Sequence, residues 1–346
     1  MKSFDEKSST GTAIISLDLS KAFDCLDHEL VVENLRTLNF PNGLISWIQD
    51  YLRDRSAIVR VCNDLSKEYT ITRGIPQGTV LGPMLFNTFV SDFRSKYNAT
   101  VVSYADDINI IMSFTDNDPQ IIENLLKDEV YNAKLWCSRK KLFLNAEKSS
   151  CLLNFRQTHY KPASLPLAER DSIKVLGVHL NNNFDWSTHI RQLYKKTNQR
   201  FHVLKQLKPL INKIDLHTIY TAYIRSTLDY CSPVFVNMNT CLTEKLEKID
   251  RRAHRIIFQQ SDDRTCTCEK GNIKMRREQI STKLFENALQ NEHHLLHTLL
   301  PKRLKHSKLL NIHFCRTQNY QRSFIHHISL ISNKRDQSAH KIEIYK

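Results

Sequence analysis

The chain has 346 residues, which is enough for two domains or for one large domain with a sizeable core. Hydrophobic residues make up 41% of it and charged residues 25%, a mixture typical of globular rather than disordered proteins. The formal net charge of +14 predicts a partner rich in phosphate, either nucleic acid or an anionic membrane surface.

The sequence argues against three other classes. The longest uncharged run, residues 74–91, contains prolines and glycines and is a poor membrane span. The first residues form no apolar signal segment. The nine cysteines are odd in number and scattered, which favours a reducing compartment over a disulfide framework.

The charge is unevenly distributed along the chain. Residues 1–150 contain 17 Lys and Arg against 20 Asp and Glu, a net charge of −3, whereas residues 151–346 contain 33 against 16, a net charge of +17. Such asymmetry predicts a catalytic part followed by a part that holds a polyanion. Lysine-coated helices without a partner would give the same pattern.

Apolar periodicity predicts alternating strands and helices in the first part of the chain. Residues 12–19 form a predicted buried strand with Asp18 at its exit. Asp27 can cap a helix over residues 27–38. The pattern then predicts a helix at 43–52, a hairpin of 57–62 and 69–73, a loop from 73 that leads into a buried helix with Pro83 near its first turn, and two strands at 100–104 and 108–112 joined by Ala105-Asp106-Asp107.

The pattern changes to long helices after Trp186. Before that point, a helix at 120–137 and strands at 150–155 and 173–180 complete an α+β part. The apolar period of the helix at 120–137 includes Ile121, Leu125, Leu126, Val130 and Leu135. The later helices are predicted at 189–207, 215–228, 242–258 and 278–298. The boundary between the α+β front and the all-α basic back falls within 181–187.

Three carboxylates at predicted strand ends are the candidate reactive groups. Asp18 ends one strand, and Asp106 and Asp107 lie between two others, so neighbouring antiparallel strands would bring the three together. Like charges that converge need compensation, which divalent cations provide. Two Mg²⁺ ions about 3.5–4 Å apart can activate a 3′-hydroxyl and stabilise the leaving pyrophosphate. Taken alone, Asp18 is equally consistent with a strand terminator, and Asp106-Asp107 with a polar turn.

The surrounding sequence forms three blocks, which are AIISLDLSKAFDCLDH at 13–28, RGIPQGTVLGPMLF at 73–86 and VVSYADDINI at 101–110. Together and in this order they resemble the palm of reverse transcriptases, specifically those of non-LTR (LINE-like) retrotransposons. The resemblance covers residues 12–260. It implies an α+β fold with a polymerase palm, an antiparallel sheet packed on helices, over 1–185, followed by an all-α thumb-like region over 186–260 and a basic helical tail over 261–346.

The resemblance implies roles for the acidic residues and for one aromatic residue. Asp18 and Asp106 would be the main ligands of two Mg²⁺ ions, with Mn²⁺ as an alternative metal, and Asp107 would be the third acidic residue. Phe23 would pack beneath the incoming sugar, where a bulky ring clashes with a 2′-hydroxyl and so selects dNTPs. The alternative for Phe23 is an ordinary core phenylalanine.

Further positions match the family's contacts with nucleotide and primer. Gln77 and Gly78 would contact the incoming nucleotide and the template, although turn geometry alone would also require glycine. Lys148, in LFLNAEKS at 142–149, would donate a proton to the leaving pyrophosphate, unless it is only a solvated lysine. Leu176 and Gly177, in IKVLGVHL at 173–180, match a primer-grip hairpin.

The helical back of the chain resembles the thumb and the helices after it, at 199–204, 219–235 and 246–257. Its cations would follow a nucleic-acid backbone, although an exposed solubilising face explains them equally well. These cations are Lys195, Lys196, Arg200, Lys205 and Lys208.

The resemblance implies an RNA-directed DNA polymerase that uses an RNA template, a DNA primer and dNTPs, without a membrane partner, inside the cell and by family analogy in the nucleus. In the family, a fingers region and often an endonuclease precede the block that contains Asp18, which here lies near the start of the sequence. We therefore expect a fragment without fingers and with impaired activity. Two alternatives are a non-catalytic remnant that binds RNA or DNA through its basic half, and another palm-type polymerase of group II intron or bacterial origin.

A zinc site was a further candidate in the C-terminal part. Cys266 and Cys268, with His293, His294 and His297 downstream, have ligand chemistry, but their spacing fits no compact zinc motif. The sequence instead predicts a polar loop followed by an exposed helix.

Overall fold

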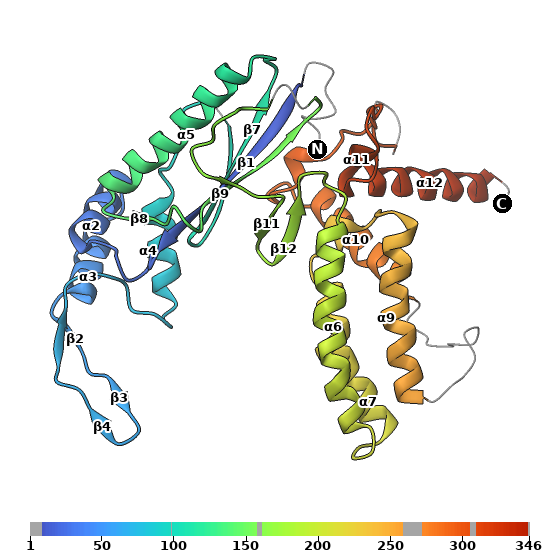
Figure 1. Cartoon of the computed structure of the whole chain (residues 1–346), viewed down its shortest axis with the longest axis horizontal. Helices are drawn as coiled ribbons and strands as arrows, with labels where there is room; N and C mark the ends of the chain where they lie inside the picture. The colour runs from blue at the N-terminus through green and yellow to red at the C-terminus, as the bar shows by residue number, and fades with distance from the viewer. Residues whose placement is uncertain (1–8, 98, 158–160, 259–271, 305–308, 345–346) are drawn as a thin grey trace. The chain divides into compact units, whose positions relative to one another are not determined.

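The computed structural model describes residues 9–97, 99–157, 161–258, 272–304 and 309–344. The chain forms two compact units, of which one ends at Ile173 and the other begins at Lys174. The first unit is α+β and the second is mainly helical, as the labelled elements of Figure 1 show. Each unit is described by itself below.

A six-stranded sheet organises the α+β unit. Its strand order is β10-β9-β1-β7-β6, with the short β8 also paired to β1, and only the β10–β9 pair is parallel. The strands predicted at 12–19, 100–104, 108–112 and 150–155 are confirmed. The strands are β1 (Gly11–Ser20), β6 (Thr100–Tyr104), β7 (Asp107–Phe114), β8 (Phe143–Leu144), β9 (Ser150–Phe155) and β10 (Ala168–Glu169).

The two faces of this sheet differ in chemistry because strand side chains alternate with a period of two residues. On one face, Ala13, Ile15 and Leu17 of β1 join Ile108 and Ile110 of β7 in a continuous apolar core. Four helices pack their apolar residues into the same core: α2 (His28–Thr37), α3 (Asn42–Leu52), α4 (Leu81–Val90) and α5 (Pro119–Arg139). The other face of the central strands is largely polar, with Thr12, Ser16, Asp18, Asp107, Asn109 and Ser150.

Side-chain caps explain where two of these helices begin. The carboxylate of Asp27 accepts from the Leu30 N–H at the start of α2, as predicted, and Asp118 accepts from the Gln120 N–H at the start of α5. The predicted apolar face of α5 is wrong at its ends, because the Ile121 and Leu135 side chains are 44% and 45% exposed. The buried stripe of α5 consists of Ile122, Leu126, Val130, Ala133, Trp136 and Cys137, together with two glutamates.

The predicted hairpin between α3 and α4 forms in two parts. The strands β2 (Arg55–Ala57) and β5 (Tyr69–Ile71) pair at its base, and β3 (Arg60–Val61) and β4 (Asp64–Leu65) pair at its tip. The hairpin extends away from the sheet of its unit in Figure 1. Val61 and Leu65 at its tip are 65% and 66% exposed, so the apolar alternation that predicts the hairpin here does not mark a buried face.

The hairpin of β11 (Ser172–Val175) and β12 (Val178–Asn181) lies at the start of the helical unit, whose first residue, Lys174, is within β11. The prediction of one strand over 173–180 is therefore wrong, because the chain reverses at Leu176 and Gly177, which both have positive φ. The helices are α6 (Ser187–Leu207), α7 (Lys213–Ile219), the π-helix η2 (Tyr220–Arg225), α8 (Ser226–Asp229), η3 (Ser232–Phe235), α9 (Thr240–Phe258), α10 (Ile273–Gln290), η4 (His297–Leu299), α11 (Gln318–Gln321) and α12 (Phe324–Ile344).

Two predicted helices of this unit differ from the observed ones. The helix predicted at 215–228 contains a π-helical segment, so its backbone hydrogen bonds change register in the middle. The helix predicted at 278–298 begins earlier, where Asn272 caps the Met275 N–H, and ends at Gln290. The exposed helix predicted around His293 and His294 is wrong, since both follow the end of α10. Cys266 and Cys268 lie outside the described residues.

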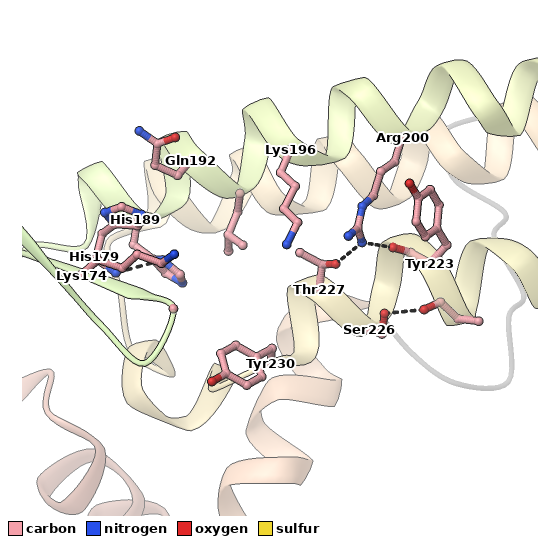
Figure 2. A pocket seen from close by; sticks show the side chains of 13 residues that line it. Lys174, His179, His189, Gln192, Lys196, Arg200, Tyr223, Ser226, Thr227 and Tyr230 are labelled. Carbon is pink, nitrogen blue, oxygen red and sulfur yellow. Dashed lines mark hydrogen bonds between the residues drawn. The ribbon is translucent and has the colours of Figure 1, made fainter. Parts of the chain in front are cut away.

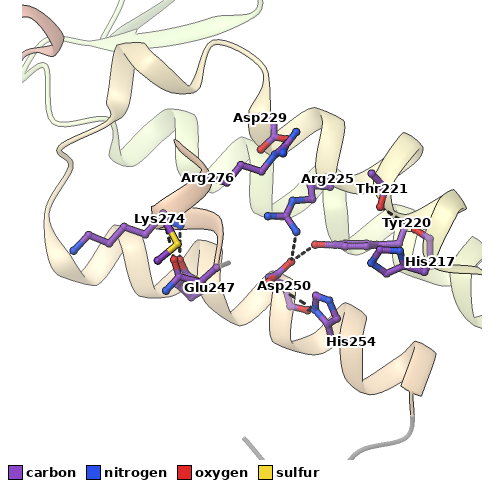
Figure 3. A network of polar contacts seen from close by, with 12 residues as sticks. His217, Tyr220, Thr221, Arg225, Asp229, Glu247, Asp250, His254, Lys274 and Arg276 are labelled. Carbon is purple, nitrogen blue, oxygen red and sulfur yellow. Dashed lines mark hydrogen bonds and ion pairs between the residues drawn. The ribbon is translucent and has the colours of Figure 1, made fainter. Parts of the chain in front are cut away.

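A buried polar network lies inside the helical unit, as Figure 3 shows. The Tyr220 hydroxyl donates to the carboxylate of Asp250, and Arg225 and His254 approach the same carboxylate at 3.8 and 3.7 Å. Burial and the nearby Asp250 raise the pKa of Tyr220 far above its ordinary value, so the phenol remains a donor. The π-helix thus supplies both Tyr220 and Arg225 to one buried carboxylate.

The predictions about membrane spans and disulfides can be compared with the structure only in the described part of the chain. None of its helices has the length and hydrophobicity to cross a membrane. All seven cysteines in this part are free thiols: Cys25, Cys62, Cys137, Cys151, Cys231, Cys241 and Cys315.

Candidate active site

The antiparallel register of β1 and β7 places two of the three candidate carboxylates opposite each other. Asp18 near the end of β1 pairs with Asp107 at the start of β7. Asp106 occupies the tight turn between β6 and β7, after Ala105 with a φ of 51°. The three residues therefore lie at one end of two neighbouring strands, as the sequence predicts. Asp18 and Asp107 are half-buried, and Asp106 is exposed.

The donor chemistry at this strand end fits a hard divalent cation, because Mg²⁺ prefers carboxylate oxygens. Within the described ranges, no three Asp, Glu, His or Cys side chains gather closely enough to hold a metal ion. The backbone thus aligns the carboxylates without bringing the three side chains together.

A turn after β8 holds Lys148 beside the same strand end. The Asn145 N–H donates to the Asp18 carbonyl at 2.8 Å, and the Asp18 N–H donates to Ser149 Oγ at 3.1 Å. The Asn145 side chain accepts from the N–H groups of Glu147 and Lys148, both at 3.2 Å. These bonds fix the backbone of Lys148 relative to Asp18 and leave the Lys148 side chain exposed.

The second sequence block is bound directly to the first. The N–H groups of Gly74 and Ile75 donate to the carbonyls of Leu26 and Phe23, at 2.8 and 2.9 Å. Gly74 has a φ of +88°, and a Cβ there would lie 2.8 Å from the carbonyl oxygen of Asp24. Glycine is therefore required at this position both by conformation and by space.

Phe23 and Gln77 are held by side-chain contacts at this junction. The Phe23 ring stacks on Phe86 of α4, with centroids 4.4 Å apart, and remains half-buried. Gln77 Nε2 donates to Asp24 Oδ1 at 2.7 Å. Gly78 has a φ of +79°, and no atom lies within 4 Å of the position that a Cβ would occupy. The backbone at Gly78 is therefore open to the approach of another molecule.

Leu176 and Gly177 belong to the helical unit and form the turn between β11 and β12. The Tyr230 hydroxyl donates to the Leu176 carbonyl at 2.7 Å. A Cβ on Gly177 would lie at an ordinary contact distance of 3.4 Å from Tyr230 Cε1, so it is the φ of +86° that favours glycine here. The candidate primer grip is therefore a two-residue hairpin turn held by a tyrosine.

Three residues of these arrangements escaped sequence reasoning. Asn145 had a recognisable signal, because Asn commonly accepts from the backbone two residues ahead in a turn. Asp24 stands in the first block but carries no sign of its contact with Gln77. The contact of Tyr230 with a turn 54 residues earlier has no local signal at all.

Comparison with known proteins gives the family. The family model described as reverse transcriptase (RNA-dependent DNA polymerase) matches residues 2–180. A probable RNA-directed DNA polymerase from transposon BS of Drosophila melanogaster is 27% identical over 236 residues, which are 63% of this chain and 25% of that protein. The RNA-directed DNA polymerase from mobile element jockey of the same species is 26% identical over 235 residues, with the same shares covered. The chain spans about a quarter of the length of these relatives.

Among solved structures, a telomerase of Candida tropicalis in complex with a TWJ fragment of telomeric RNA aligns with a TM-score of 0.37 and 12% identity. The alignment covers 80% of this chain and 50% of that one. Because the family model spans half of the chain and contains every palm residue discussed above, the chain belongs to the reverse transcriptase family, and its homologues are reverse transcriptases of non-LTR retrotransposons.

Proposed function

We propose that this chain is the polymerase part of a non-LTR retrotransposon reverse transcriptase, which adds dNTPs to the 3′-hydroxyl of a DNA primer on an RNA template. The observation that carries the proposal is the register of β1 and β7, which sets Asp18 opposite Asp107 with Asp106 in the adjacent turn. By analogy with its family, the polymerase would act at nuclear DNA. The palm would occupy residues 1–185, the thumb-like region 186–260 and the tail 261–346.

Asp18, Asp106 and Asp107 would hold two Mg²⁺ ions, or Mn²⁺ in their place, through carboxylate oxygens. When bound, such ions lower the pKa of the attacking hydroxyl and neutralise charge on the phosphates. The protein's own contribution is positioning, because phosphoryl transfer depends mainly on alignment and electrostatic stabilisation.

The remaining palm residues would orient the nucleotide. Phe23 would support the sugar, and its stacking on Phe86 keeps the ring fixed against a 2′-hydroxyl. Gln77 and the open backbone at Gly78 would meet the nucleotide and the template. Lys148 would give a proton to the leaving pyrophosphate. In the helical unit, the hairpin turn at Leu176 and Gly177 would hold the primer.

The test is metal-dependent incorporation of dNTPs by the full chain on a DNA-primed RNA template. We expect Asp18→Asn and Asp106→Asn each to lower the rate at least about 100-fold, since each removes a charged ligand from the reacting centre. Asp50→Asn is the matched control, because Asp50 is an exposed aspartate in the last turn of α3 and belongs to none of the three sequence blocks. Equal rates for wild type and Asp106→Asn would refute the proposal.

A second function rests on the net charge of +17 over residues 151–346. In this alternative the chain is a remnant that binds RNA or DNA through its basic half. It would bind nucleic acid in a salt-sensitive way without incorporating any nucleotide, whichever metal is supplied.

A further inference from the structure

The helical unit contains a groove that the palm residues do not explain. It has a volume of about 520 Å³, within the range typical of sites for small molecules. Its walls are the β11–β12 hairpin, α6 and the segment 222–230, so it lies entirely within one unit, as Figure 2 shows.

The groove is strongly cationic. Lys174 from the hairpin and Lys196 and Arg200 from α6 line it, and no Asp or Glu is among its lining residues. Lys196 reaches from α6 into the space above Thr227 in Figure 2. Among the described residues, neither lysine forms an ion pair. The lysines therefore leave positive charge available for an anion.

Arg200 is part of the wall rather than a mobile cation. Its Nη1 donates to the Tyr223 carbonyl and to Thr227 Oγ1. Its guanidinium lies 4.2 Å from the centre of the Tyr223 ring. The cation thus fixes the orientation of an aromatic side chain that is still 43% exposed.

Two histidines close the hairpin end of the groove without adding charge. His189 is 2% exposed, and its Nε2 is buried without a hydrogen-bond partner in the described part of the chain. Its Nδ1 accepts from the His179 N–H at 3.4 Å. Burial and the nearby His179 lower the pKa of His189 to about 4, so this ring is neutral at physiological pH. The positive charge of the groove thus comes from lysine and arginine.

A second aromatic ring comes from the same segment 222–230, next to the β11–β12 turn. Tyr230 lines the groove, and its side chain is 53% exposed. Its hydroxyl is bound to the Leu176 carbonyl, so the ring position is set by the β11–β12 turn. Gln192 of α6 adds an amide, which can both donate and accept.

We propose that this groove binds one nucleotide of a single nucleic-acid strand, with its phosphate at Lys174 and Lys196 and its base against Tyr223 or Tyr230. The groove combines the two groups that single-strand binding uses, namely ammonium donors for phosphate and exposed aromatic rings on which any base can stack. Inside a duplex both faces of a base are covered by its stacked neighbours, so the groove selects an unpaired nucleotide. The inference deepens the proposed function, because it adds a strand contact outside the palm.

The first test is fluorescence anisotropy of the full chain with three labelled probes: a 12-nucleotide oligo(dT), a 12-nucleotide oligo(rU) and a blunt 12-base-pair DNA duplex. We expect the double variant Lys174→Gln, Lys196→Gln to bind both single strands about tenfold more weakly. The salt dependence should fall by about 0.7 in log–log slope, because both lysines neutralise the same phosphate. Duplex binding should change less than twofold.

The control is Lys245→Gln, because Lys245 is exposed on α9 of the same unit and does not line the groove. It should weaken binding less than twofold. An equal loss in Lys245→Gln, an equal loss on the duplex, or no binding of single strands by the wild type would each overturn the inference. A larger loss on oligo(rU) than on oligo(dT) assigns the groove to an RNA strand, and the reverse assigns it to a DNA strand.

A photocrosslink tests the base contact separately. A single strand with 5-iodouracil at its centre should crosslink to Tyr223 or Tyr230, and the crosslink should fall at least about tenfold in the double lysine variant. Crosslinks that map only to other segments would overturn the stacking role. Incorporation of dNTPs by the wild type is measured separately. An inactive wild type whose single-strand binding still falls in the double lysine variant refutes the polymerase proposal alone. An active wild type whose binding is unchanged in that variant refutes this inference alone.

Discussion

The two units place their charged groups by different means. In the α+β unit, strand pairing sets Asp18 opposite Asp107, and a main-chain bond fixes the loop that carries Phe23. In the helical unit, charged groups are placed by side-chain contacts, as with Arg200 at the groove and the partners of buried Asp250. The first arrangement should tolerate side-chain truncation and fail on backbone change, and the second should do the opposite.

The largest expected effect is in the helical unit, at Asp250. Replacing Asp250 with Ala leaves Arg225 buried without its carboxylate and removes the acceptor of Tyr220, so we expect a loss of about 3–5 kcal/mol in the free energy of unfolding. Urea unfolding followed by circular dichroism measures it. Glu244→Ala, at an exposed position of the same helix, is the control and should change stability by less than about 0.5 kcal/mol. A small loss at Asp250 would show that this unit does not depend on its buried network.

The second effect is a dependence of stability on pH. The pKa of His189 is lowered from 6.5 to about 4, so the unfolded chain binds a proton more readily than the folded one. The contribution of the neutral His189 to the free energy of unfolding is therefore complete above pH 6.5. It is lost, by about 3 kcal/mol in all, as the pH falls towards 4. We expect the unfolding free energy of the wild type to fall over this interval. The slope should be smaller in His189→Gln, and identical slopes would contradict the assignment.

The third effect tests the backbone of the α+β unit with a pair of glycines. Gly74→Ala forces a Cβ to within 2.8 Å of a carbonyl oxygen at a φ of +88°, and should destabilise by about 1–3 kcal/mol. Gly43→Ala, in helix α3 with open space around it, should stabilise by about 0.5–1 kcal/mol. Thermal unfolding decides the signs. A loss of stability in both variants would show that helix propensity at Gly43 and conformational strain at Gly74 do not explain how the two glycines differ.

The smallest effect concerns the turn that holds Lys148. Asn145→Ala removes the acceptor of the Glu147 and Lys148 N–H groups and should cost about 1 kcal/mol of stability. Because the substitution also frees the backbone of Lys148, the rate of dNTP incorporation should fall by more than the loss of folded protein explains. Asn145→Asp should restore the acceptor and with it the rate. Equal rates in wild type and Asn145→Ala would separate the turn from catalysis.

Much of the fold could be predicted from the sequence. The four longer strands of the central sheet and the capped helix after Asp27 rest on local patterns of period and capping, and the family blocks rest on local motifs. The predictions failed where the decision is not local. Ile121 and Leu135 continue an apolar period but face outwards, because the sheet buries the stripe that contains Leu126 and Val130. The reversal at Leu176 could be recognised through the family resemblance but not from alternation alone.

The sequence by itself determined which chemical groups this protein has. It places the three aspartates, the glycines that the turns require and the excess of basic residues after residue 150. The tertiary structure decided which of these groups meet. Residues 18 and 107 face each other only because two strands pair in one register, and a shift by one residue would send one side chain to the other face. Likewise, Tyr230 reaches Leu176 only after the helices pack, because a contact across 54 residues depends on the whole core between them.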